Sequence, residues 1–186
     1  MSAADGRRRV RSRQLVGVLA GLTVLVLNSP GAADGAVVAA PAFAGVAALT
    51  GSSAELAGVV FEGVATVQTA TGTVETIKLT TTAAAITDLR LRPPCTPISG
   101  LGAGMTTEST TPGQSISRAP AGMTVYATAL TASTPTGSVT WTAANPPPAR
   151  QLGDLSLAEL SVQLVSLRAP EIVLPGLHQA SLYCAS

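Results

Sequence analysis

The chain has 186 residues, of which 46% are hydrophobic, 11% are charged and only 3% are aromatic. Five of its eleven basic residues stand within the first 13 positions, and the chain after Ala33 carries six basic against nine acidic residues, a net charge of −3. Proteins that bind nucleic acid displace counterions from phosphate with a basic face, so this balance excludes a nucleic-acid partner. The length after Ala33 suits one domain with a buried core.

The N-terminus has the composition of an export signal. A basic head over Arg7 to Arg13 is followed by an uncharged apolar run from Leu15 to Leu27, which is the order found in secretory signals. The run is shorter than the roughly 20 residues that a membrane-spanning helix needs. We therefore expect residues 1–33 to be a signal peptide that is cleaved after Gly31-Ala32-Ala33. Cleavage after Ala42-Phe43-Ala44 and a signal retained as a membrane anchor are the alternatives.

The segment after the signal is rich in small residues. Residues 34–58 contain many Ala and Gly without a clear period, and we expect a flexible segment, with a short helix over Ala47 to Leu56 as the alternative. Thr and Val are abundant beyond it, and both residue types favour strands. Residues 59–186 are therefore predicted to form a β-rich domain.

A β-hairpin is predicted at the start of this domain. Val59 to Gln68 and Thr73 to Thr80 are rich in Val and Thr, and the first alternates between two partly apolar faces. Thr69 to Gly72 lie between them and form the turn, in which Gly72 supplies a positive φ at little steric cost.

The next predicted strand presents two arginines. Ile86 to Arg92 ends in the alternation Leu-Arg-Leu-Arg, which places Arg90 and Arg92 on one face of a strand. We interpret this face as solvated, with an anion-binding site as the alternative.

The segment from Pro93 to Gly122 interrupts the pattern of strands. It contains five prolines and many Gly, Ser and Thr residues, and long connections of this kind inside a domain are functional or mobile. We expect a long loop, and the place for a binding loop if the protein has one. The Gly-rich run Gly100 to Gly104 lacks the spacing of the dinucleotide-binding fingerprint.

Two further strands are predicted around a turn. Met123 to Leu130 and Ser138 to Ala143 are joined through Thr134-Pro135-Thr136-Gly137, a sequence suited to a type I turn. Trp141 alternates with polar residues in the second of these strands. We expect it in the core; an exposed platform for stacking sugars is the alternative, although such platforms usually combine several aromatic residues.

The C-terminal part is predicted to hold two more strands. Leucines over Leu155 to Leu167 fit a helix as well as a strand, and we expect mostly strand. Pro175-Gly176 then predicts a turn before a last strand over Leu177 to Cys184.

The two cysteines agree with export. Cys95 begins the long loop and Cys184 lies near the C-terminus, and in an oxidising compartment such a pair is expected to form a disulfide. A metal site is the alternative, but His178 is the only histidine in the sequence and the three residues cannot complete a four-ligand site. We predict no metal-binding and no cofactor-binding residue, and no cofactor.

Motifs for catalysis are incomplete. Gly113 to Ser117 misses the last glycine of the hydrolase G-x-S-x-G motif. Glu62 and Glu75 flank the predicted hairpin, but without an aromatic-lined cleft they do not indicate a glycosidase. His178 could pair with Asp88 or Asp154 and a serine. We assign no catalytic residue and favour a protein that is not an enzyme, with an extracellular hydrolase using a site near His178 as the alternative.

The order of an Arg-rich signal, Thr/Val-rich strands, a cysteine after Arg92-Pro93-Pro94 and a second cysteine at the end resembles uncharacterised exported β-rich proteins of high-GC Gram-positive bacteria. The resemblance implies a bacterial, exported, β-rich protein and transfers no functional residue.

The sequence therefore predicts an all-β protein, in which a single β-sandwich or β-roll-like domain of antiparallel strands follows the signal peptide. We expect it to be secreted or held in the extracytoplasmic cell envelope, where it would act as a binding or structural module. A membrane-anchored envelope component at the membrane surface is a further alternative.

Overall fold

The computed structural model of the protein describes residues 45–98, 103–111 and 113–185. The predicted signal peptide, residues 1–33, lies outside the described residues, as does the segment 34–44. The described residues form eleven strands and no helix. None of them therefore belongs to a helix long and apolar enough to cross a membrane.

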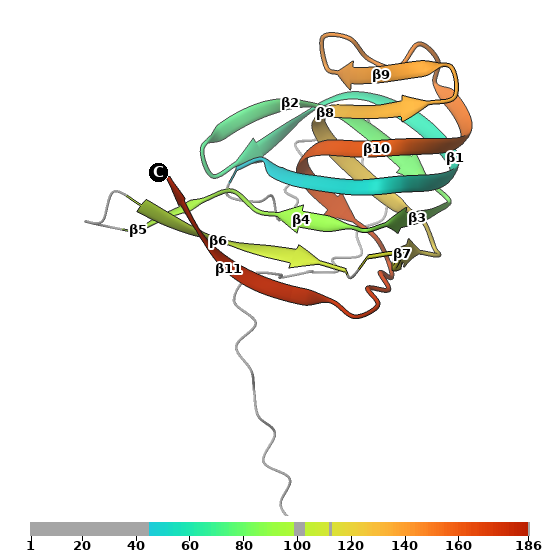
Figure 1. The fold of residues 1–186 in the computed structure, drawn as a ribbon. Coiled ribbons are helices and arrows are strands. Elements are labelled where there is room, and N and C mark those ends of the chain that lie inside the picture. Colours follow the sequence, from blue (N-terminus) through green and yellow to red (C-terminus); the bar gives the residue numbers. More distant parts are fainter. Residues whose placement is uncertain (1–44, 99–102, 112, 186) are drawn as a thin grey trace, which may run out of the picture.

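All pairings between these strands are antiparallel (Figure 1), which confirms the all-β prediction. In chain order the strands are β1 (Ala47–Thr69), β2 (Gly72–Thr81), β3 (Ala83–Thr87), β4 (Arg90–Arg92), β5 (Thr96–Ile98), β6 (Ala103–Thr110), β7 (Ile116–Ala119), β8 (Met123–Thr134), β9 (Gly137–Thr142), β10 (Gln151–Arg168) and β11 (His178–Ala185).

The long strand β1 organises the domain. Along one side it pairs in turn with β2, β3 and β4, from Thr69 opposite Gly72 to Ala48 opposite Arg92. The hairpin turn lies where it was predicted, and Gly72 has a φ of +131°, a conformation that L side chains rarely adopt. Along its other side β1 pairs with β10.

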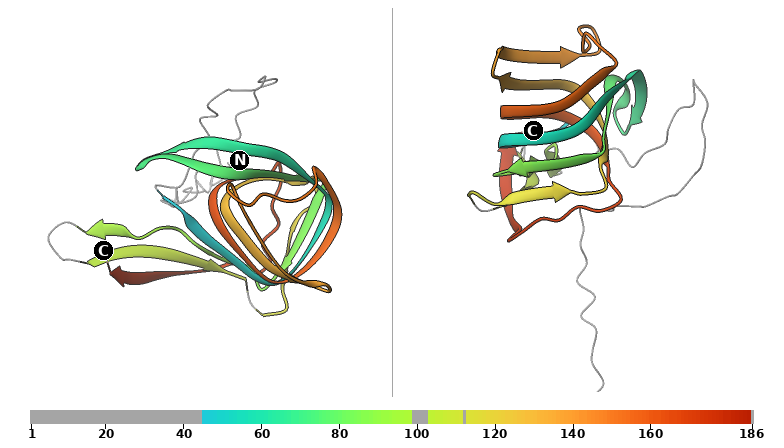
Figure 2. Two further views of the ribbon diagram at one scale, coloured as in Figure 1. Left: turned by 90° about the horizontal axis from the view of Figure 1, so that it is seen from above. Right: turned by 90° about the vertical axis from the view of Figure 1, so that its right-hand side faces the viewer.

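The sheet closes on itself. β10 pairs with β8, β8 pairs with β2, and β2 returns to β1, so that these four strands complete a circuit (Figure 2). The predicted single roll of antiparallel strands is therefore confirmed. β10 also confirms the strand expected over Leu155 to Leu167, and the turn at Pro175-Gly176 precedes β11.

The hydrophobic core fills the interior of this roll. Ile77 and Leu164 are fully buried, and Trp141 is 9% exposed, which confirms its predicted place in the core. A space of about 30 Å³ remains among the core leucines and valines, enough for one or two water molecules but not for an organic ligand. Any ligand that this space cannot hold has to bind on the outside of the roll.

The prediction for residues 34–58 was wrong over residues 47–58, which form the first half of β1 and are neither flexible nor helical. Ala47, Leu49 and Gly51 are buried, and the inward positions then change phase so that Ala54 and Leu56 are buried. Because the side chains are small and the inward positions change phase, the two-residue period of a strand cannot be recognised in this part of the sequence. Pairing with β3, β4 and β10 on the two sides of the segment satisfies its backbone.

The prediction of a long loop over residues 93–122 was also wrong, because this segment contains β5, β6 and β7. β6 pairs with β4, β5 and β11. Its main partner, β11, stands far along the chain, and no local pattern could indicate that pairing. The three strands β5, β6 and β11, which we call the wing, extend away from the roll (Figure 2).

Candidate functional site

The two cysteines form the predicted disulfide. Cys95 and Cys184 are bonded, with their Cα atoms 6.1 Å apart. The bond joins the residue before β5 to β11 and so fastens two strands of the wing. In the described part of the chain, no group of three or more His, Cys, Asp or Glu residues is arranged to hold a metal ion.

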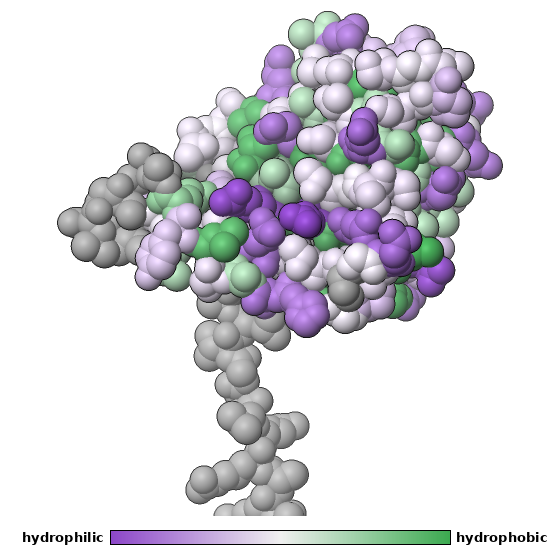
Figure 3. All heavy atoms as spheres, in the orientation of Figure 1, coloured by the Kyte–Doolittle hydropathy of each residue, from purple (hydrophilic) through white to green (hydrophobic). Residues whose placement is uncertain are grey.

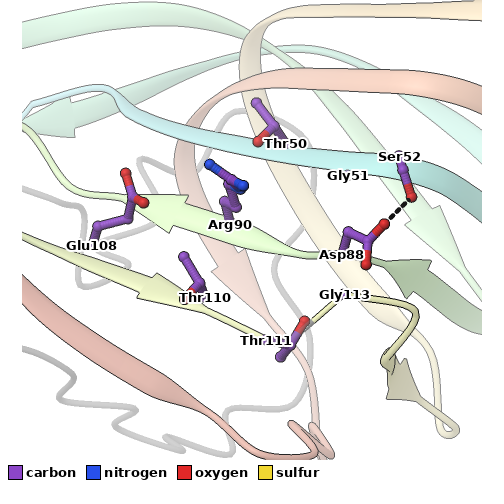
Figure 4. A pocket seen from close by; sticks show the side chains of 9 residues that line it. All are labelled: Thr50, Gly51, Ser52, Asp88, Arg90, Glu108, Thr110, Thr111 and Gly113. Atoms are coloured by element: carbon purple, nitrogen blue, oxygen red, sulfur yellow. Dashed lines mark hydrogen bonds between the residues drawn. The ribbon is translucent and has the colours of Figure 1, made fainter.

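A polar groove crosses the outer face of the sheet where β1, β4 and β6 lie side by side (Figure 4). It has a volume of about 690 Å³. Figure 3 shows hydrophilic residues gathered over β4 and β6 on this face. Its lining consists of four hydroxyl side chains, three charged side chains and two glycines: Thr50, Ser52, Thr110, Thr111, Asp88, Arg90, Glu108, Gly51 and Gly113.

The sheet register explains why these side chains meet. Thr50 of β1 lies opposite Arg90 of β4, Arg90 opposite Thr110 of β6, and Thr110 opposite His178 of β11. Residues that are partners in register point to the same face, and neighbouring strands lie about 4.8 Å apart. Four residues from distant parts of the chain therefore form one row across the sheet, with Arg90 between two threonines.

Asp88 closes one end of the polar groove. Its Oδ2 accepts a hydrogen bond of 2.7 Å from Ser52 Oγ, and its Oδ1 accepts one from the backbone N–H of Gln114. Its own N–H donates to the carbonyl of Ser115 at 3.1 Å. Asp88 has a φ of +52°, which Asp tolerates better than most residues. Both carboxylate oxygens thus hold the loop before β7 against β1.

Arg90 and Glu108 form no ion pair with any residue that the structure describes. Within the described ranges, the ion pair that forms is between Arg150 and Glu62, with 3.7 Å between Nη2 and Oε2, and it lies outside the polar groove. Arg90 is exposed and Glu108 is half-buried. A guanidinium and a carboxylate are therefore available to a ligand in the same groove.

The residues that could have formed a hydrolytic triad with His178 are not arranged as one. His178 is exposed, and in the part of the chain that the structure describes no hydrogen bond of its imidazole is found. Ser52 donates directly to Asp88, with no imidazole between them. Asp154 instead accepts a hydrogen bond of 2.8 Å from the N–H of Gly58.

The carboxylate pair and the incomplete G-x-S-x-G motif do not form catalytic sites either. Glu75 lies opposite Thr66, four positions along β1 from Glu62, so the two carboxylates do not face each other. Ser115, the serine of the incomplete G-x-S-x-G motif, directly precedes the strand β7, whereas the hydrolase elbow has a helix after its serine.

Comparison of the chain with protein-family models, with curated proteins and with solved structures finds no match.

The sequence indicated only part of the polar groove. The alternation at residues 89–92 places Arg90 and Arg92 on one outward face, as predicted, and both are exposed. Thr50 and Ser52 come from the segment that was expected to be flexible, and Glu108 and Thr110 from the one expected to be a loop. Glu108 and Thr110 could have been assigned to the groove only if the sequence of residues 103–110 had shown the pattern of a strand.

Proposed function

We propose that the protein is an extracytoplasmic binding module and that its ligand binds in the polar groove. The observation that carries this proposal is that one groove combines hydroxyl groups with a guanidinium and a carboxylate that form no ion pair with the described residues, on a domain whose interior is filled. Such convergent polar groups fix the orientation of a ligand and select for it.

The disulfide supports the location. Bonds of this kind persist in oxidising compartments such as the periplasm and the extracellular space, and are rare where thiols are kept reduced. Together with the basic head and apolar run of residues 7–27, it supports export by a cleaved signal into the medium or the cell envelope. N-terminal sequencing of the exported protein should begin near Asp34. A chain that keeps Met1 or Ser2 in a membrane fraction would support the anchored alternative.

The chemistry of the polar groove favours a glycan as the ligand class. Hydroxyl groups of a saccharide both donate and accept hydrogen bonds, and Arg90 donates while Glu108 accepts. Thr50 and Thr110, on either side of Arg90 in register, add hydroxyls that do both. None of the described residues that line the groove is aromatic, so recognition would depend on hydrogen bonds.

Binding of soluble glycans tests this proposal. Neutral dextran and acidic polygalacturonate are titrated into the exported protein by calorimetry, and we expect at least one to bind. Hydrogen bonds to charged groups contribute roughly 1.5–3 kcal/mol, so Arg90→Ala should weaken binding about tenfold or more. Arg168→Ala, also an exposed arginine but outside the groove, serves as the control. No binding to either glycan, or equal loss in both variants, would refute the glycan class.

A further inference from the structure

β11 leaves one edge of the sheet open. In the order of the strands β11 stands at one end, and among the described residues it pairs only with β6. Its eight residues run from His178 to Ala185. The other side of β11 therefore presents a row of backbone N–H and C=O groups that could pair with a further strand.

The described residues of β11 show none of the sequence or register features that protect an edge strand. Natural edge strands are guarded by lysine, proline, inward-pointing charges or β-bulges. β11 contains no Lys, Arg, Asp, Glu or Pro. Its register with β6 also runs without a shift from His178 opposite Thr110 to Ala185 opposite Ala103. A regular and uncharged edge of this length is suited to strand addition.

Tyr183 gives the edge an anchor. Its side chain is 81% exposed, and its partner in register, Met105 of β6, is 39% exposed. The other two large aromatic residues with a polar atom, Trp141 and Tyr126, are buried. Exposed Tyr and Met side chains on one face are typical of contact surfaces, and a thioether contacts an aromatic ring favourably.

The edge is held in place without a partner. Cys184, next to Tyr183, is bonded to Cys95, and β6 pairs with every residue of β11. A strand that is already ordered loses little conformational entropy when a second strand binds to it.

We propose that the free edge of β11 binds an extended peptide segment of another polypeptide by strand addition, with an apolar side chain of that peptide packed on Tyr183 and Met105. Main-chain hydrogen bonds would supply affinity, and the contact with Tyr183 would supply selectivity. The peptide should be free of proline and poor in charge, because its backbone has to pair along an uncharged strand.

A second copy of the chain suits this edge less well. Stable protein interfaces use roughly 20–30 residues a side, whereas β11 offers eight. Strand addition by a peptide needs only the length of one strand. The area available at the edge therefore favours a peptide over a stable dimer.

The edge is separate from the polar groove. Side chains alternate between the two faces of a strand, so Glu108 and Thr110, which line the groove, point to one face of β6 and Met105 to the other. A failure of the glycan proposal would leave this one standing, and the reverse also holds.

Random octapeptides displayed on phage provide the probe. They are selected on the exported wild-type protein, and the enriched sequences are synthesised and titrated. Tyr183→Ala should weaken their binding about tenfold or more, as expected for an interface anchor. Val64→Ala, which truncates a side chain that is also exposed, by 49%, on β1, should leave binding unchanged.

Hydrogen exchange gives the second readout. Bound peptide should slow the exchange of alternate backbone amides along β11, because successive N–H groups of an edge strand point to opposite sides. The proposal is overturned if no peptide is enriched, if Tyr183→Ala binds as wild type does, or if protection falls outside β11. Self-association that competes with the peptide at β11 would also overturn it, in favour of a second copy.

Discussion

Gly104 of β6 packs directly against the sulfur of Cys95. A methyl group at this position would overlap Cys95 Sγ and would come within 2.8 Å of the carbonyl oxygen of Thr96. Only glycine leaves room for the disulfide to lie on β6 while β5 pairs with the same strand. The wing therefore requires both the disulfide and a residue without a side chain at position 104.

Gly104→Ala should accordingly destabilise the protein by about 1–3 kcal/mol, the usual cost of overpacking. Thermal unfolding measures the effect, and thiol labelling of the denatured, unreduced variant measures how much of the disulfide still forms. Gly113→Ala is the matched control, because a Cβ there would meet no atom nearer than Asp88 Oδ1 at 3.9 Å. Equal melting temperatures for the two variants would contradict the prediction.

Loss of the disulfide should weaken the fold without abolishing it. Cys95 and Cys184 are 89 residues apart in sequence, and closure of a loop of this length contributes about 4–5 kcal/mol in the chain-entropy model. The double variant Cys95→Ser/Cys184→Ser should lose about this much free energy of unfolding. The closed circuit of β1, β2, β8 and β10 does not include either cysteine, so strand-dominated circular dichroism should persist at 25 °C.

Denaturant titration of the oxidised and double-variant proteins measures this difference. Two reactive thiols per chain in protein recovered from outside the cell would show that the bond does not form there.

Asp88 should stabilise the loop beside the polar groove through both carboxylate oxygens. Asp88→Ala removes the acceptor of the Gln114 N–H and the shorter hydrogen bond of the Ser52 hydroxyl, which keeps only the carbonyl of Thr87 at 3.4 Å. It also places an alanine at a φ of +52°. We expect a loss of about 1–3 kcal/mol. Asp88→Asn, which tolerates this φ and keeps a carbonyl acceptor, should lose less. Urea unfolding of both variants is the measurement, and similar losses for Asn and Ala would contradict this account.

Two buried hydroxyls should respond in opposite ways to removal. Thr76 is fully buried and donates a hydrogen bond of 2.9 Å to the carbonyl of Ala65, so Thr76→Val should cost about 1 kcal/mol. Ser166 Oγ is also buried, and no partner for it is found among the described residues. Ser166→Ala should therefore be neutral or stabilising by up to about 1 kcal/mol.

Chemical denaturation at one pH compares the two variants. A loss of stability in Ser166→Ala as large as that in Thr76→Val would show that Ser166 has a partner after all.

The sequence by itself determined the features that depend on short-range pattern. Alternation between residues 59 and 80, together with the glycine at 72, correctly predicted the hairpin. The alternation of residues around Trp141 correctly predicted its place in the core. Two cysteines with no other thiol to bond were enough to predict the disulfide. Each of these inferences rests on side-chain period, turn chemistry or residue count, which a window of a few residues contains.

Only the tertiary structure decided how the strands are partnered. Thr110 lies between Arg90 and His178 because β6 pairs with β4 on one side and with β11 on the other, and nothing near residue 110 in the sequence indicates either neighbour. The closure of the roll depends in the same way on β10 pairing with both β1 and β8. Backbone hydrogen bonds between strands are alike for every sequence, so the choice of partner and register follows from packing over the whole domain. The polar groove and the open edge of β11 are products of that choice.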